Sequence, residues 1–256
     1  MVGVVLALGV VWLCVNPASF EKIFTRVEDD GPEEETATRI ESNGSGEAIN
    51  DGRIGGNSEN ENVGTEGVAP LAMEVLARLE VKGRAPKTGY TREQFYNGWP
   101  TVEGCSLRQR IIKRDFGESA VILDGCNVVA GEYDEPYTGE HLAYGAREEI
   151  SKGVQIDHVV ALSDAWQKGA QNVTSEERYA MATDPLNLLA VEAAANKKKS
   201  DGDAATWLPP NKKFRCQYVA RQVSVKYKYK LWVTEAEKGA IERVLAGCPG
   251  EKAVGV

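Results

Sequence analysis

The sequence predicts an α+β fold, mostly helical and stapled by disulfides, in residues 71–256 of a 256-residue chain. Three observations predict it. A stretch rich in β-branched residues at 154–162 and a short apolar run at 188–191 are typical of strands, apolar residues elsewhere recur at helical spacing, and four cysteines are widely separated. This region has about 185 residues, which is enough for one substantial hydrophobic core.

The chain begins with an apolar run at residues 2–15. These 14 residues are too few for a membrane-spanning helix, which needs about 20, but they suit the apolar core of a signal peptide. No lysine or arginine precedes the run, which is unusual for a signal peptide. We expect residues 1–19 to be a signal peptide, with a retained N-terminal membrane anchor as the alternative.

Residues 20–70 form an acidic segment with few apolar residues, which we expect to be a disordered linker because it cannot bury enough surface to offset its ordering entropy. Residues 1–70 hold 13 acidic and 4 basic residues, whereas the remainder holds 25 and 26. The net charge of −8 therefore belongs to the N-terminal quarter and does not argue against a nucleic-acid partner. A hydrophobic content of 42% excludes a wholly disordered chain and a multi-span membrane protein.

A basic stretch lies near the other end of the chain. Residues 197–230 contain 10 lysines and arginines and 2 aspartates, a local charge of +8. Two interpretations stay open from composition alone: a solvated helix face, or a surface that contacts phosphate. The position of this stretch relative to a catalytic motif has to decide between them.

The folded region starts near Leu71, where apolar residues at helical spacing predict a short helix that ends before Gly83. Its four cysteines are even in number, as in exported domains with disulfides. Three pairings are possible, and sequence order favours Cys105–Cys126 and Cys216–Cys248. A zinc site is the alternative, although no pair has the short spacing that such sites use.

The chain has only two histidines. His158 follows Asp157 within the predicted strand at residues 154–162, and a histidine satisfied inside the core is the competing interpretation. His141 follows a Pro-Tyr-Thr-Gly-Glu run and is expected to be exposed.

Downstream residues weaken the interpretation of His158 as a core residue. Residues 184–191 predict a turn that leads into a short strand, with Asn187 at the junction, and residues 192–199 begin a helix that carries Asn196. The order strand, insertion, strand, helix, with Asp-His on the first strand, resembles the ββα-metal finger of the HNH nucleases.

Longer segments resemble one branch of that superfamily: the exported bacterial HNH nucleases related to the C-terminal domain of GmrSD-type restriction enzymes. The segments lie at residues 90–99, 104–105, 114–115, 136–139, 156–170, 184–188, 196–201 and 207–210. The resemblance covers about residues 90–248. It implies a ββα-metal (HNH) motif embedded in the disulfide-stapled nuclease domain of residues 71–256. Glu135 departs from the family pattern, which tends to have aspartate there.

The resemblance implies a metal-dependent endonuclease that cleaves DNA, and RNA as a further substrate, with little sequence specificity. His158 would be the general base, because a neutral imidazole accepts a proton from water near neutral pH. Asp157 and Asn196 would hold one divalent cation, Mg²⁺ first and Mn²⁺ second, since their oxygens are hard ligands. By the same resemblance Asn187 would orient the histidine.

Three basic residues are candidates for contact with phosphate. Lys199 lies one helical turn after Asn196, Arg147 precedes Asp157 by ten residues, and Arg221 lies on the predicted helix within the basic stretch. The alternative function is a non-catalytic module that binds nucleic acid or a cell surface on the same fold. We expect a secreted or extracytoplasmic monomer, and the sequence indicates no protein partner.

Overall fold

The computed structural model describes residues 69–255, so the predicted signal peptide or anchor and nearly all of the predicted linker lie outside the described residues. The α-helices are α1 (Ala72–Leu76), α2 (Leu107–Phe116), α3 (Arg147–Gly153), α4 (Leu162–Gln167), α5 (Ser175–Thr183), α6 (Ala193–Lys199), α7 (Arg215–Lys228) and α8 (Glu235–Leu245). The strands are β1 (Thr101–Val102), β2 (Cys105–Ser106), β3 (Val121–Leu123), β4 (Asn127–Asp134), β5 (His141–Tyr144), β6 (Val154–His158) and β7 (Leu188–Glu192). Short 3₁₀ turns are η2 (Arg92–Gln94), η3 (Gly117–Ser119), η4 (Ala170–Asn172), η5 (Pro185–Asn187) and η6 (Lys212–Phe214). The fold is α+β, as expected.

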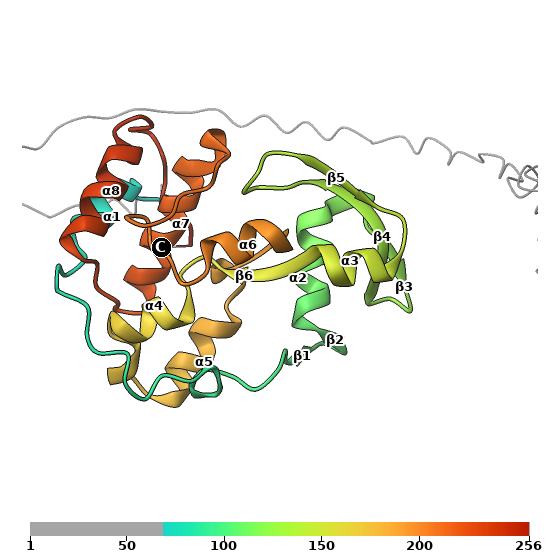
Figure 1. Ribbon diagram of the computed structural model, residues 1–256, viewed down its shortest axis with the longest axis horizontal. Coiled ribbons are helices and arrows are strands. Elements are labelled where there is room, and N and C mark those ends of the chain that lie inside the picture. Colours follow the sequence, from blue (N-terminus) through green and yellow to red (C-terminus); the bar gives the residue numbers. More distant parts are fainter. Residues whose placement is uncertain (1–68, 256) are drawn as a thin grey trace, which may run out of the picture. The chain divides into compact units, whose positions relative to one another are not determined.

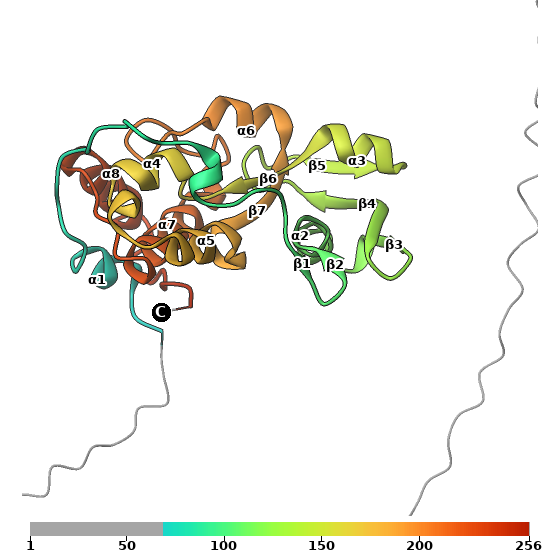
Figure 2. The same cartoon turned by 90° about the horizontal axis from the view of Figure 1, so that it is seen from below.

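The strands form three small antiparallel sheets with the orders β1-β2, β3-β4-β5 and β6-β7. Helices α1, α4, α7 and α8 gather on one side of β6, whereas α2, α3 and the β3-β4-β5 sheet lie on the other (Figures 1 and 2). The β6-β7 pair therefore lies between a helical part and a part rich in strands.

Strand β7 is buried on both faces, which explains its continuous apolar sequence. Leu189 and Val191 pack into the core formed with α1, α7 and α8. Leu188 and Ala190 face the other way, into the core shared with α2 and β4. Because side chains alternate along a strand, this one short strand joins two hydrophobic cores.

Helix α6 begins directly after β7, so the described chain has the predicted order of strand, insertion, strand and helix. The pairing of β6 with β7 places His158 opposite Leu188 and Val154 opposite Glu192. The insertion between the two strands contains α4 and α5, and α5 starts with a capping box formed by Thr174 and Glu177. In residues 69–255 no helix is long and apolar enough to cross a bilayer.

Both disulfides form in the pairing that sequence order favoured. Cys105 and Cys126 join β2 to the β3-β4 turn, and Cys216 and Cys248 join α7 to the segment after α8. Each of the four sulfurs is bonded to its disulfide partner, so these cysteines do not form the zinc site considered as the alternative.

Replacing both Cys216 and Cys248 with serine is expected to lower the free energy of unfolding by about 3 kcal/mol, because this bridge closes a loop with a sequence separation of 32 residues. Urea unfolding of the oxidised protein and of the variant measures the difference. The Cys105/Cys126 double serine variant is the matched comparison, with a separation of 21 residues and a slightly smaller expected loss. Equal stability of the Cys216/Cys248 variant and the oxidised parent would contradict this prediction.

Candidate active site

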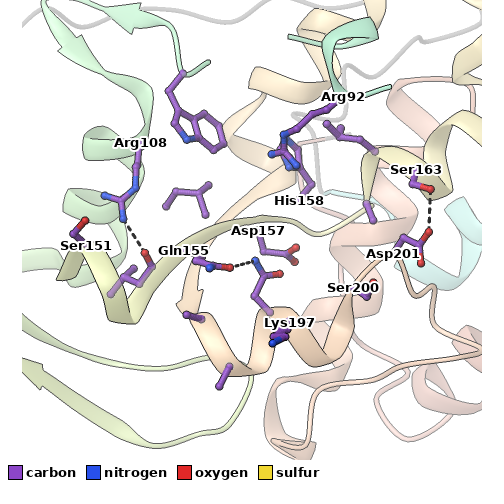
Figure 3. Close-up of a pocket in the computed structure, with 18 of the residues that line it drawn as sticks. Arg92, Arg108, Ser151, Gln155, Asp157, His158, Ser163, Lys197, Ser200 and Asp201 are labelled. Atoms are coloured by element: carbon purple, nitrogen blue, oxygen red, sulfur yellow. Dashed lines mark hydrogen bonds between the residues drawn. The ribbon is translucent and has the colours of Figure 1, made fainter. Parts of the chain in front are cut away.

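A cleft of about 850 Å³ opens beside β6 and α6, and the predicted Asp-His pair lies in its wall (Figure 3). The polar and aromatic residues in its lining come from several parts of the chain. They are Tyr90, Arg92 and Trp99 before α2, Arg108 on α2, Ser151 on α3, Gln155, Asp157 and His158 on β6, Ser163 on α4, Asn196 and Lys197 on α6, and Ser200 and Asp201 after α6. Residues from distant parts of the sequence thus meet around the end of β6.

His158 is 5% exposed, and its imidazole stacks on Trp99 with the ring planes 11° apart. Its Nε2 lies 2.9 Å from the carbonyl oxygen of Ala182. A carbonyl only accepts hydrogen bonds, so Nε2 carries the proton and Nδ1 keeps its lone pair. Burial lowers the pKa of His158 to about 3, against the opposing effect of the Ala182 hydrogen bond. The imidazole is therefore a neutral base at physiological pH.

Asn187 is fully buried and holds the chain on both sides of His158. Its Oδ1 accepts a hydrogen bond of 2.8 Å from the backbone N–H of Val160, and its own carbonyl accepts one from Val159. Its Nδ2 lies 3.4 Å from the carbonyl oxygen of Met181, the residue before Ala182. Asn187 thus connects the end of β6 to the segment whose carbonyl fixes the His158 tautomer, a geometry suited to an orienting role.

Asp157 is 6% exposed, and both of its carboxylate oxygens have donors. The Tyr137 hydroxyl donates to Oδ2 over 2.5 Å, and the Lys199 ammonium donates to Oδ1 over 3.0 Å. Burial raises the pKa of Asp157, while the charge of Lys199 and the Tyr137 hydrogen bond oppose that rise. The carboxylate is therefore held in one orientation by groups behind the cleft wall.

Asn196 and Asp157 offer oxygen atoms to the same cleft, which is the kind of donor set that Mg²⁺ or Mn²⁺ takes. The Asn196 Nδ2 donates to Gln155 Oε1 over 2.9 Å, so the amide nitrogen is directed at Gln155. Among the described residues, the Asn196 side-chain oxygen has no hydrogen-bond partner. A carboxylate, an amide oxygen without a partner and room for water fit a hard cation.

Three cations in the cleft were not assigned a phosphate contact from the sequence: Arg92, Arg108 and Lys197. Arg92 stands over the Tyr96 ring and hydrogen-bonds its hydroxyl. Burial is the main cause of the lowered pKa of His158, and the positive charge of Arg92 lowers that pKa further. In the sequence Arg92 was visible only as part of a family-like segment at residues 90–99. No local pattern showed that this segment returns to β6.

The structure does not bring the three predicted phosphate contacts to the cleft. Arg147 is exposed at the start of α3 and does not line the cleft. Arg221 lies 3.4 Å from the carbonyl oxygen of Leu188 and packs near Arg114, outside the cleft lining. The Lys199 side chain has no exposed surface, because its ammonium is enclosed with Asp157.

Comparison with known proteins assigns the chain to a family. Residues 108–244 match the model of the C-terminal domain of GmrSD restriction endonucleases. A protein of Arthroderma benhamiae, described as an uncharacterized secreted protein, is 35% identical over 183 residues, which cover 70% of this chain and 86% of that protein. The chain belongs to the GmrSD C-terminal domain family. No solved structure matches it.

Membership in the GmrSD C-terminal domain family confirms the relation to restriction endonucleases that the motifs implied. The matched segment includes Asp157, His158, Asn187 and Asn196, but it begins after Arg92. The Arthroderma relative is fungal, so it gives no support to the bacterial origin that the resemblance implied.

Proposed function

We propose that this protein is an exported, metal-dependent endonuclease that hydrolyses phosphodiester bonds of DNA, and of RNA as a further substrate, with little sequence specificity. Strands β6 and β7 with helix α6 would form its ββα-metal motif. The observation that carries the proposal is the neutral imidazole of His158, which shares a cleft with oxygen donors and with three cationic side chains. Membership in a family of restriction endonuclease domains supports the same reaction class.

His158 would take a proton from the attacking water through Nδ1, because its Nε2 already donates to the Ala182 carbonyl. Asn187 would hold the end of β6 and the neighbouring Met181 carbonyl in place. Asp157 and Asn196 would hold one divalent cation, which when bound supplies positive charge for the phosphate and the leaving oxygen. Arg92, Arg108 and Lys197 would bind the phosphates that flank the scissile bond.

Export is supported by two observations. The Arthroderma relative is described as secreted, and both disulfides are typical of oxidising compartments. The expected signal peptide at residues 1–19 lies outside the described residues. Mass spectrometry of the protein in culture medium tests this step, because a mature chain beginning after residue 19 is the expected result.

Plasmid DNA cleavage in a series of divalent metals, with and without EDTA, tests the reaction. Cleavage in Mg²⁺ or Mn²⁺, abolished by EDTA and by Asp157→Asn, is the expected result. Activity that survives both treatments would overturn the metal-dependent mechanism. DNA binding in a gel shift without cleavage in any metal would instead favour the non-catalytic binding module.

Replacing Arg92 with alanine is expected to raise KM for DNA about tenfold and to reduce the dependence of binding on salt concentration, because one phosphate contact is lost. Steady-state kinetics at two or more salt concentrations measure both effects. Arg78→Ala is the matched control, since Arg78 is exposed and lies outside the cleft lining. An effect of Arg147→Ala larger than that of Arg92→Ala would restore the sequence-based assignment over the cleft geometry.

A further inference from the structure

Lys199 is a buried cation beside the proposed metal ligand. It is 2% exposed, and its ammonium donates to Asp157 Oδ1 over 3.0 Å and to the His158 carbonyl over 2.8 Å. Among the ion pairs of residues 69–255, Asp157 is the only acidic partner of Lys199. One ammonium thus contacts both residues of the Asp-His pair.

The carboxylate of Asp157 needs such a partner. An ionised carboxylate removed from water is strongly unfavourable unless it is paired and hydrogen-bonded. Tyr137, which is fully buried, supplies a neutral donor to the other oxygen of Asp157. Its turn is held by Glu135, whose carboxylate accepts hydrogen bonds from Thr138 and from the backbone N–H of Glu192. Two buried side chains therefore fix the Asp157 carboxylate, and Lys199 is the charged one of the two.

We propose that Lys199 is a positioning residue that acts as a permanent counter-charge to Asp157, keeping the carboxylate ordered without metal and limiting its affinity for a divalent cation. This inference rests on the proposed function, because it takes Asp157 as the ligand of the cation. It replaces the expectation that Lys199 contacts phosphate.

The physical basis is that a divalent cation bound to Asp157 would bring a second positive charge to the carboxylate that the Lys199 ammonium already contacts. Like charges at such short range, in a partly dehydrated site, repel with an energy that changes a binding constant severalfold or more. Removal of the ammonium therefore has opposite effects on two states. The metal-free protein loses the partner of a buried charge, and the metal-bound protein loses a repulsion.

Lys199→Met tests this, because methionine keeps much of the side-chain volume and removes the charge. We expect the variant to bind Mn²⁺ alone about tenfold more tightly than the parent in calorimetric titration. We also expect a large loss of thermal stability in EDTA that becomes smaller in saturating Mn²⁺, since ligand binding stabilises the folded state. A purely structural role would lower the melting temperature equally with and without metal, and that result overturns the inference.

Two further variants keep the test decisive. Lys198→Met removes a neighbouring exposed charge on α6 and is expected to change Mn²⁺ affinity much less. The double variant Asp157→Asn with Lys199→Met is expected to regain stability in EDTA and to lose its response to Mn²⁺, which covers the case in which Lys199→Met alone does not fold. A double variant as unstable as Lys199→Met overturns the inference.

Failure of the proposed function has its own signature. If neither the parent nor Lys199→Met binds Mn²⁺, the cation site at Asp157 is wrong, and the inference falls with it. If the parent binds Mn²⁺ and Lys199→Met binds it with equal affinity, only the counter-charge role is overturned.

Discussion

Replacing His158 with glutamine is expected to lower kcat for plasmid cleavage about a thousandfold, because the base that accepts the proton of water is removed. Glutamine can still donate a hydrogen bond toward the Ala182 carbonyl, which His158 Nε2 contacts at 2.9 Å. The fold and the Mn²⁺ affinity are therefore expected to persist. Single-turnover cleavage, circular dichroism and calorimetry of the same preparation measure the three quantities. Retention of more than a tenth of the parent rate would remove His158 from the mechanism.

The His158→Gln variant is also expected to differ from the parent in how its free energy of unfolding depends on pH. Unfolded His158 takes up a proton as the pH falls through about 6.5, whereas burial lowers the folded pKa to about 3. The unfolded state thus binds more protons between these values, so the free energy of unfolding falls as the pH decreases. The slope from this residue approaches about 1.4 kcal/mol per pH unit below pH 6.5.

Urea unfolding at pH 7 and pH 5, in EDTA, compares the parent with His158→Gln. The parent is expected to lose more stability over this interval than the variant. The hydrogen bonds of Asp134 and Glu132 raise the pKa of His141. Because His141 is present in both proteins, its contribution to the loss of stability cancels in the comparison. An identical loss in the two proteins would show that His158 is protonated in the folded state already at pH 5.

Strands β6 and β7, helix α6 and the disulfides were predictable because each depends on local sequence or on simple pairing rules. The β-branched run that ends in Asp157 and His158 predicted a strand, and β6 covers Val154–His158. The turn at Asn187 predicted the start of the next strand, which begins at Leu188. An even number of well-separated cysteines predicted disulfides, and their sequence order predicted the pairing.

The partners of the site residues were not predictable, because long-range contacts fix them. The hydroxyl on Asp157 comes from Tyr137, 20 residues away, and the carbonyl on His158 comes from Ala182, 24 residues away. Arg92 reaches the cleft from the segment before α2. Composition also could not show that Lys199 and Lys226, two lysines of the basic stretch, are buried in ion pairs.

Lys226 belongs to a buried charge cluster that holds the helical part together. The cluster has three carboxylates and three cations: Asp164, Asp203, Glu237, Arg84, Lys168 and Lys226. Lys168 is fully buried and lies within 2.7 Å of an oxygen of each carboxylate. Burial opposes the ionisation of Asp203, but the hydrogen bond and charge of Lys168, together with the charges of Arg84 and Lys226, outweigh it and lower the pKa of Asp203 to about 2.

Replacing Lys168 with methionine is expected to lower the free energy of unfolding by about 4 kcal/mol, because three buried carboxylates then share two cations. That is a large fraction of the stability of an ordinary domain. Urea unfolding at pH 7 measures the loss. Arg84→Met is the matched control, because it also removes a cation of the cluster. The Arg84 side chain is 35% exposed, so water replaces part of its interaction with the carboxylates. The expected loss in the free energy of unfolding is therefore about 1 kcal/mol.

The double variant Lys168→Met with Glu237→Gln separates charge balance from packing. If the cluster is stabilised by neutralisation of its carboxylates, removing one negative charge along with Lys168 recovers a substantial part of the lost stability. No recovery would mean that the volume and hydrogen bonds of Lys168 matter more than its charge. Asp164 lies on α4, which begins four residues after His158, and Asp203 follows α6 by four residues. Loosening the cluster is therefore also expected to lower nuclease activity by displacing β6 relative to α6.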